Sequence, residues 1–373
     1  MSKNRRDGLN VKIECTLELQ RWANDHVLPE RLEDLSFQKT YAVPLEYKKY
    51  PSVEAIALTS KTQVNWICQL ARYGPTWRKW VEHIDGKHKL HHGKWILVSI
   101  GTHAMEKKRA DEDHKNKAKI THSFRPLVYM FSKTHEDTES IFFAHQAIEM
   151  VAQLYHRDSV PSQVLLNTSH DTSLNASLNR SLNTSLDTSL QTPVYIAKAQ
   201  LALRQGLPRL VVPGVGCADH AAGIKAGFSS QHPGVEMMGC WPHIAWRFRQ
   251  GRLAVTRDHP RYVEIKELLP DLQTCHTVGM WDVLVQLVGR IWGDRDAALN
   301  QLWTSIMVTP YNRWHLGVTD VPGATPSNQP QESWHNVGVM MRIKNALNAS
   351  TAHVLEKTLP KIINLDGASL PAR

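Results

Sequence analysis

Three acidic residues stand where their carboxylates could act together on metal ions. Asp85 ends an expected strand, Asp219 lies a few residues beyond another, and Glu332 lies in the first turn of an expected helix. Cleavage of a phosphodiester by two metal ions requires carboxylates gathered around ions roughly 3.5–4 Å apart. Mg²⁺ and Mn²⁺ prefer such hard oxygen ligands and keep water molecules that can serve as the nucleophile. The three residues therefore predict a two-metal site for phosphoryl transfer.

Each carboxylate also has a purely structural interpretation. Asp85 and Gly86 could form a hairpin turn, Asp219 could cap a helix, and Glu332 could offset a helix dipole. Because the chain has 35 acidic residues, two aspartates and a glutamate in this order identify nothing by themselves. The choice depends on the elements that would position them.

A change of hydrophobic period near residue 80 marks the start of a sheet. Three strand patterns with short connections, at 80–85, 95–100 and 127–131, predict an antiparallel meander. The elements expected after them are a helix over 134–155, a strand over 209–212, a helix over 221–228, a strand over 234–238, a helical block over 263–303 and a last helix over 330–347.

This order of elements predicts an α/β fold with a ribonuclease-H-like mixed sheet and a helical insertion before the last helix. The first and fourth strands of such a sheet are neighbours, so Asp85 and Asp219 would converge at one edge. A helix beginning nearby could bring Glu332 to the same place.

The remaining segments divide the chain around that sheet. Apolar residues at mixed helical spacing over 16–31 and 53–73 predict an N-terminal helical region. Tetrapeptides such as LNTS repeat over residues 166–190, and this repeat predicts a disordered surface expansion. The charged segment 106–119 is expected to be a solvated loop. The expected divisions are an N-terminal helical region at 1–77, a catalytic domain at 78–348 with a repeat insertion at 163–192 and a helical insertion at 245–320, and a C-terminal tail at 349–373.

A cysteine and a histidine at a strand-to-helix junction offer a second kind of chemistry. The spacing of Cys240 and His243 could supply half of a zinc site, with His259, Cys275 and His276 as candidates to complete a tetrahedron. The equally plausible alternative is a buried structural cysteine beside a histidine that lines the core.

A basic and aromatic segment follows directly. Arg247, Arg249 and Arg252 could hold phosphates near the active edge, with Trp246 and Phe248 buried behind them. A solvated end of an amphipathic helix explains the same residues.

Composition allows a large globular protein with a polyanionic partner. The chain has 373 residues, 42% of them hydrophobic, and its 44 basic against 35 acidic residues give a net charge of +9. This balance fits nucleic acid, and it also fits a basic enzyme without such a partner. Five scattered cysteines without a CxxC pair fit a reducing compartment. No secretory signal and no apolar run long enough for a bilayer are visible, so an intracellular protein with no membrane partner is expected.

Four blocks in the same order resemble the catalytic domain of Mutator-like element transposases, over residues 80–347. The first combines DGKHKL at Asp85 with a strand ending in Gly-Thr and a strand beginning FRP. The second is ADHAAGI around Asp219, and the third, CWPH at Cys240, is similar to the family's Cys-x-x-His motif. The fourth, PGATPSNQPQES, resembles the stretch that carries the catalytic Glu, here Glu332.

The resemblance implies a DDE-type DNA transposase with two Mg²⁺ or Mn²⁺ ions held by Asp85, Asp219 and Glu332. It implies hydrolysis at the transposon ends, transfer of the freed 3′-hydroxyl to target DNA, nuclear localisation, and function as a homo-oligomer. The zinc finger ahead of the core and the cysteine-rich module behind it, usual in the family, have no counterpart in this sequence. The alternatives are a domesticated or truncated DNA-binding protein that regulates transcription without catalysis, and a folded remnant that neither binds specifically nor cuts.

Overall fold

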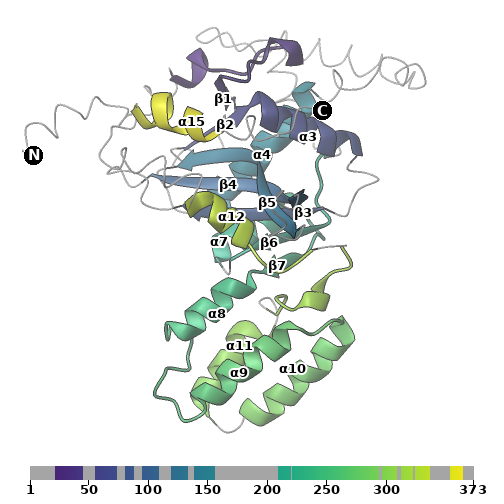
Figure 1. The fold of residues 1–373 in the computed structure, drawn as a ribbon, viewed down its shortest axis with the longest axis vertical. Coiled ribbons are helices and arrows are strands. Elements are labelled where there is room, and N and C mark those ends of the chain that lie inside the picture. The colour runs from purple at the N-terminus through teal and green to yellow at the C-terminus, as the bar shows by residue number, and fades with distance from the viewer. Residues whose placement is uncertain are drawn as a thin grey trace, which may run out of the picture.

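The computed structural model describes twelve segments of the chain, and its sheet and helices account for nearly all of them (Figure 1). The described residues are 22–44, 55–73, 80–87, 95–108, 119–132, 138–155, 209–219, 221–293, 296–308, 312–321, 324–336 and 353–363. The tetrapeptide repeat expected at 163–192 lies outside them.

A seven-stranded mixed sheet organises the larger part of the molecule, in the order β1-β2-β5-β4-β3-β6-β7. The strands β1 to β5 pair antiparallel, whereas β3 pairs parallel with β6, and β6 pairs parallel with β7. The predicted α/β class is confirmed, and the first strand of the predicted meander, β3, pairs with β6, the strand that follows α4 (Thr138–Tyr155). The strands are β1 (Thr40–Val43), β2 (Ala55–Ser60), β3 (Val81–Lys87), β4 (Ile96–Lys108), β5 (Lys119–Ser132), β6 (Val215–Ala218) and β7 (Met237–Gly239).

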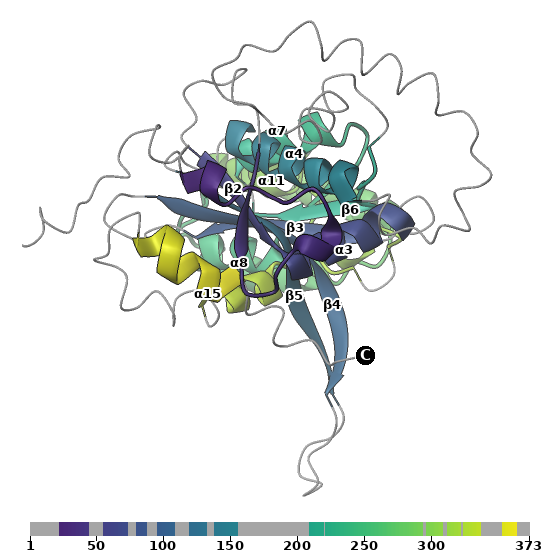
Figure 2. The same ribbon diagram turned by 90° about the horizontal axis from the view of Figure 1, so that it is seen from above.

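The β4 and β5 strands form a hairpin that is much longer than the sequence pattern indicates. Their pairing extends from Ile96↔Ser132 to Lys108↔Lys119, with a register shift between Ile100 and Gly101. The outer part projects away from the body of the molecule (Figure 2). The charged segment 106–119 was therefore wrongly expected to be a loop throughout, because both of its ends continue strand pairing that begins in the core.

The region before residue 78 is not simply helical. It contributes β1, β2, the 3-10 turn η1 (Leu32–Asp34) and one long helix, α3 (Lys61–Tyr73). All six residues of β2 are buried, and the strand pairs with β5. A strand buried on both faces has no alternating pattern, so its apolar residues imitate a buried helix. The strand expected at 209–212 is also misplaced, because the structure has β6 at 215–218.

Helices cover both faces of the sheet. The helices α3, α4 (Thr138–Tyr155) and α7 (Ala222–Gln231) pack on one face around Ile84, Val98 and Phe228. The opposite face is covered by α12 (Gln329–Ser333) and by a helical segment formed of η6 (Val354–Thr358) and α15 (Leu359–Ile363). Residues expected to be a C-terminal tail therefore complete the core, because Leu355, Leu359 and Ile362 are fully buried against the sheet.

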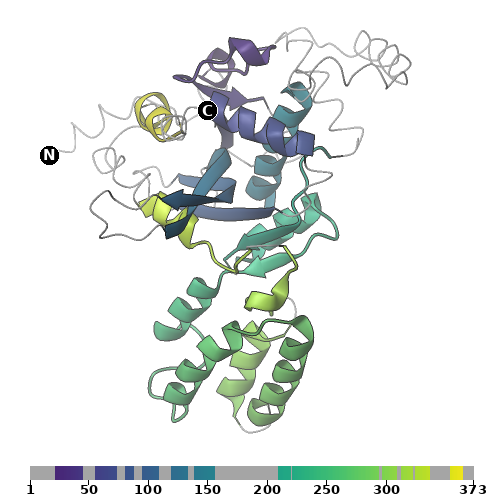
Figure 3. The same cartoon turned by 45° about the vertical axis from the view of Figure 1, so that its right-hand side comes forward.

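A separate helical unit lies between β7 and α12 in the sequence and beside the sheet in space (Figure 3). Its core is rich in tryptophan, with Trp281, Trp292 and Trp314 nearly inaccessible to solvent. No helix among the described segments is long and apolar enough to cross a membrane. The unit comprises α8 (Trp241–Arg249), α9 (Tyr262–Gln273), α10 (Val278–Trp292), α11 (Ala297–Ile306) and the 3-10 turn η4 (Leu316–Val318).

Candidate metal centre

Asp85 and Asp219 lie on neighbouring parallel strands at matching positions. The last pair in the β3–β6 register is Ile84 with Ala218, so Asp85 and Asp219 are the next residue along β3 and the residue directly after β6. Parallel neighbours are roughly 4.8 Å apart, which brings the two carboxylates to one place. Asp85 is not in a hairpin turn: it pairs with Ser99, and β3 continues beyond it.

The surroundings of Asp219 disfavour its charged form. Burial raises the pKa of this carboxyl, and the negative charge of Asp85 raises it further, against opposing effects of the Ala221 amide, His243 and Arg247. The Ala221 N–H donates to Oδ1 of Asp219 over 2.9 Å. Since Ala221 itself is the N-cap of α7, Asp219 is not that helix's cap. Two adjacent carboxylates of this kind form a site that a cation would stabilise.

We expect Asp219→Asn to stabilise the metal-free protein at pH 7 by roughly 0.5–2 kcal/mol, as removing functional strain commonly does. Asn can still accept the Ala221 amide hydrogen bond. A raised pKa means that the folded state holds this proton more tightly than the unfolded chain, so stability falls as the pH rises through the pKa of Asp219. The gain should therefore shrink on acidification, as measured by urea denaturation with EDTA at several pH values. The exposed Asp258→Asn is the control, and a loss of stability in Asp219→Asn at pH 7 would contradict the prediction.

Glu332 of α12 meets Cys240 and His243 beside the two aspartates. The Cys240 thiol donates toward Oε1 of Glu332 over 4.0 Å, and Nδ1 of His243 lies 3.5 Å from the same oxygen. One ligand atom from each residue lies within 4.8 Å of the others, so the group could hold a metal ion. Cys240 is attached to the sheet because its amide donates to the Ala218 carbonyl over 2.8 Å.

The thiol of Cys240 lies close to two of the three carboxylates. Burial raises the pKa of its thiol to about 12, and the charges of both Glu332 and Asp85 contribute to the rise. The thiol therefore stays protonated at neutral pH in the metal-free protein. Asp85, Asp219 and Glu332, predicted from sequence as one set, share these surroundings.

The proposed companions of Cys240 and His243 in a zinc site lie elsewhere. His259 interacts with Asp296 over 3.2 Å, and the Cys275 thiol donates to the Thr277 carbonyl over 3.5 Å. His276 is exposed. These residues belong to the helical unit, which folds around its own core, and the described residue grouped with Cys240 and His243 is Glu332.

Two buried amides fix α12 against the sheet. Oδ1 of Asn328 accepts a hydrogen bond from Nδ1 of His83 over 2.8 Å, and its Nδ2 donates to the Ile84 carbonyl over 3.1 Å. The Gln331 Nε2 donates to the carbonyl and the hydroxyl of Ser99 over 2.8 and 2.9 Å. Both amides are fully buried, and Glu332 follows directly. The position of the glutamate is thus set by its neighbours.

His335 holds Asp85, and the sequence analysis did not identify it. Its Nδ1 lies 3.2 Å from Oδ2 of Asp85, and its Nε2 lies 2.8 Å from the Ser99 hydroxyl. The carboxylate can only accept, so Nδ1–H donates to Asp85, and Nε2 accepts from Ser99. Because Gln331 donates to the same hydroxyl, the hydrogen bonds run in one direction toward Asp85. One carboxylate oxygen is held in this way, and the other is left for a ligand.

A signal for this network exists in the sequence. Asn328, Gln331 and His335 recur at helical spacing, and the last two fall on the stripe of α12 that faces the sheet. Polar residues on a buried stripe need partners, so they mark a hydrogen-bond network. Their partners Ser99 and Asp85 are distant in sequence and could not be inferred.

We expect His335→Ala to weaken divalent-ion binding by about 10–100-fold, the usual cost of losing a group that orients a metal ligand. Isothermal titration with Mn²⁺ measures the effect, and His335→Gln, which can still donate to Asp85, should recover part of it. The control is His315→Ala, since His315 is an equally buried histidine of the helical unit. Unchanged Mn²⁺ affinity in a folded His335→Ala protein would contradict the assigned role.

The three arginines predicted to contact phosphate have different surroundings. Arg247 is half-buried and close enough to Asp219 to lower the pKa of that carboxyl. Arg249 is exposed, and the guanidinium of Arg252 lies over the Trp246 ring, 4.5 Å from its centroid. Trp246 is therefore exposed, contrary to expectation, because it stacks with an arginine at the surface and not with the core.

Comparisons of the chain with family models, with curated proteins and with solved structures find no match. The geometry of the site and the resemblance in its sequence blocks are accordingly the basis for a functional assignment.

Proposed function

We propose that the protein is a metal-dependent DNA transposase of the DDE type, with a ribonuclease-H-like catalytic core. The observation that carries the proposal is the meeting of Asp85, Asp219 and Glu332 from three separate elements around Cys240. The order of β3, β4, β5, α4, β6, α7 and β7, followed by a helical unit and α12, is compatible with such a core.

The donor set fits Mg²⁺ or Mn²⁺. Asp85, Asp219 and Glu332 offer hard oxygen ligands, and the mutual repulsion of the two aspartates is what a divalent cation would offset. Bound ions would activate the attacking water or 3′-hydroxyl and stabilise the leaving oxygen. Cys240 and His243 are assigned here to holding Glu332, because a thiol that keeps its proton at neutral pH is a poor partner for these hard ions.

The remaining residues of the site have positioning and binding roles. His335 holds one oxygen of Asp85, and Asn328 fixes the start of α12 so that Glu332 faces the aspartates. Arg247 is close enough to Asp219 to lower the pKa of that carboxyl, and it is suited to hold a scissile strand by its phosphate.

DNA is the partner that the surface supports best. Trp246 and Arg252 form an exposed stacked pair on α8 and the turn after it, and His243 near the start of the same helix lies beside Glu332. Aromatic rings and arginines of this kind stack on bases and contact phosphates. With the net charge of +9, this favours transposon ends and target DNA as substrates, and nuclear localisation with them.

The test is cleavage of supercoiled plasmid and of a labelled oligonucleotide by the purified full chain. We expect nicking with Mn²⁺ and Mg²⁺, none with Ca²⁺ or EDTA, and joining of 3′-hydroxyl ends to a target strand. Sequence-selective binding without cleavage would instead establish the alternative, a DNA-binding protein derived from a transposase. Weak binding to all DNA that falls steeply with salt, again without cleavage, would indicate an inactive remnant.

A further inference from the structure

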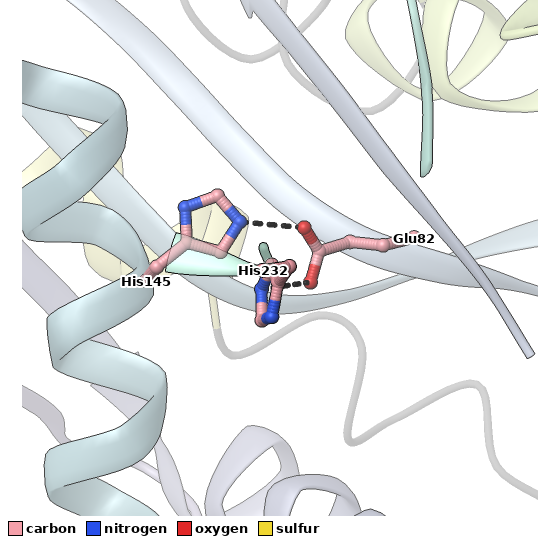
Figure 4. Close-up of side chains that lie close together, drawn as sticks. All are labelled: Glu82, His145 and His232. Carbon is pink, nitrogen blue, oxygen red and sulfur yellow. Dashed lines mark hydrogen bonds and ion pairs between the residues drawn. The ribbon is translucent and has the colours of Figure 1, made fainter. Parts of the chain in front are cut away.

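A buried carboxylate and two buried imidazoles meet on the face of the sheet opposite Asp85 (Figure 4). Glu82 of β3, His145 of α4 and His232, which directly follows α7, are each less than one-twentieth exposed. One ligand atom from each lies within 4.8 Å of the other two. Glu82 and Asp85 are separated by an odd number of strand positions, so they point to opposite faces. The cluster is distinct from the candidate metal centre.

The helix α4 determines which nitrogen of His145 carries a lone pair. Nδ1 lies 2.7 Å from the Ile141 carbonyl oxygen, which can only accept, so Nδ1 is protonated. In the neutral ring the lone pair is then on Nε2, and this atom faces Oε1 of Glu82 over 2.6 Å. A lone pair and a carboxylate oxygen repel each other unless a cation lies between them. Histidines that bind metals commonly donate their other nitrogen to a backbone carbonyl, as His145 does.

His232 is a buried imidazole in need of a partner. Neither of its ring nitrogens has a hydrogen-bond partner among the described residues, and Nε2 lies 4.0 Å from Oε2 of Glu82. Burial lowers the pKa of His232 to about 3, so the ring is neutral at physiological pH and keeps a lone pair. A buried polar group without a partner is costly, and coordination of a metal ion would remove that cost.

The carboxylate between the two rings is ionised. Burial alone would raise the pKa of Glu82, but positive charge and a hydrogen bond at the position of His145 hold it below its usual value, so a cation beside this carboxylate keeps it ionised. One oxygen of Glu82 is directed to each imidazole (Figure 4). Metal–ligand bonds of roughly 2.0–2.1 Å place tetrahedral ligand atoms about 3.3 Å apart. The observed separations of 2.6 and 4.0 Å lie on either side of this spacing.

We propose that Glu82, His145 and His232 bind one zinc ion. Two neutral imidazole nitrogens and a carboxylate are ligands that suit zinc, and the ion takes the place of the cation that the His145 geometry requires. The ion links β3, α4 and the end of α7, three elements that are far apart in the sequence. Because all three ligands are buried in the core, the ion is structural, and its binding free energy adds to the stability of the fold. This inference does not depend on the proposed transposase activity.

Elemental analysis of the full chain, dialysed against metal-free buffer, tests the proposal. We expect one equivalent of zinc in Cys240→Ser and in Glu332→Gln, which alter residues of the other centre, and loss of that equivalent in His232→Gln. The matched control is His315→Gln, which alters an equally buried histidine and should keep the zinc. Zinc that persists in His232→Gln, or that disappears in Cys240→Ser, would overturn the assignment. Iron in place of zinc would also overturn the assignment. The absence of any metal would overturn it too and would indicate a buried imidazolium–carboxylate pair.

A second measurement covers the case in which His232→Gln does not fold. Chelator-treated Cys240→Ser protein is titrated with Co²⁺ and with Zn²⁺. We expect visible d–d absorption with Co²⁺ and a melting temperature raised by roughly 5 °C or more at saturating Zn²⁺. A titration that gives neither change would refute the site.

Discussion

Replacing Asp85 with Asn is expected to lower Mn²⁺-dependent nicking by about a thousandfold or more, because the substitution removes the negative charge of a residue that would hold the metal. The Asn side chain is nearly the same size, and it can still accept the hydrogen bond from Nδ1 of His335. The fold and the affinity for DNA should therefore stay close to those of the wild type. Single-turnover nicking and a gel-shift assay in Ca²⁺ measure the two properties separately.

The exposed Asp258→Asn on the helical unit is the matched control, since it makes the same chemical change away from the carboxylates. A high Mn²⁺ concentration should partly rescue a variant that has lost only ion affinity. If folded Asp85→Asn protein nicks DNA at the wild-type rate, then Asp85 is not a metal ligand, and the proposed function fails with it.

Replacing Trp314 with Ala is expected to destabilise the helical unit by roughly 3–5 kcal/mol, the usual cost of removing a fully buried tryptophan. Its ring stacks on Trp241, with centroids 5.1 Å apart, and meets Trp281 edge-on at 4.9 Å. Its Nε1 donates to the Ile306 carbonyl over 2.6 Å, so the substitution also leaves a buried acceptor without its donor. Urea denaturation followed by far-ultraviolet circular dichroism measures the loss.

The comparison for Trp314 is Trp246→Ala, because Trp246 is 41% exposed and packs mainly against Arg252. Its removal should change stability by less than about 1 kcal/mol, as is usual at exposed cation–π pairs. Equal destabilisation by the two substitutions would show that Trp314 does not anchor the core. A DNA-affinity defect confined to Trp246→Ala would in turn support its proposed contact with bases.

The sequence predicted the central part of the sheet because the pattern there is local. The strands around Asp85, Ser99 and Tyr129 have short connections, and the parallel pairing of β3 with β6 follows from the helix between them. The strand β2 was missed because burial of all its side chains removes the alternation that distinguishes a strand from a helix. Its identity depends on pairing with β5, which no local pattern encodes.

The candidate site was predicted in outline for a similar reason. Asp85 and Asp219 end adjacent strands, so element order alone brings them together, and the resemblance added Glu332. His335 depends on side-chain packing between α12 and β4 and was not found. Glu82 could have been predicted to have a buried partner, because a charged residue on a strand that is buried on both faces needs one. Its partner His145 is remote in sequence, so only the fold identifies it.

The helical segment of η6 and α15 has a consequence for how the chain reaches its folded state. It packs against Ala42 of β1 and Ile56 of β2, so this segment covers strands that are synthesised long before it. On the ribosome, that apolar face of the sheet stays exposed until residues 353–363 have emerged. Contacts of such long sequence separation slow folding and favour aggregation of the incomplete chain. The nascent protein should therefore depend on chaperones until α15 docks.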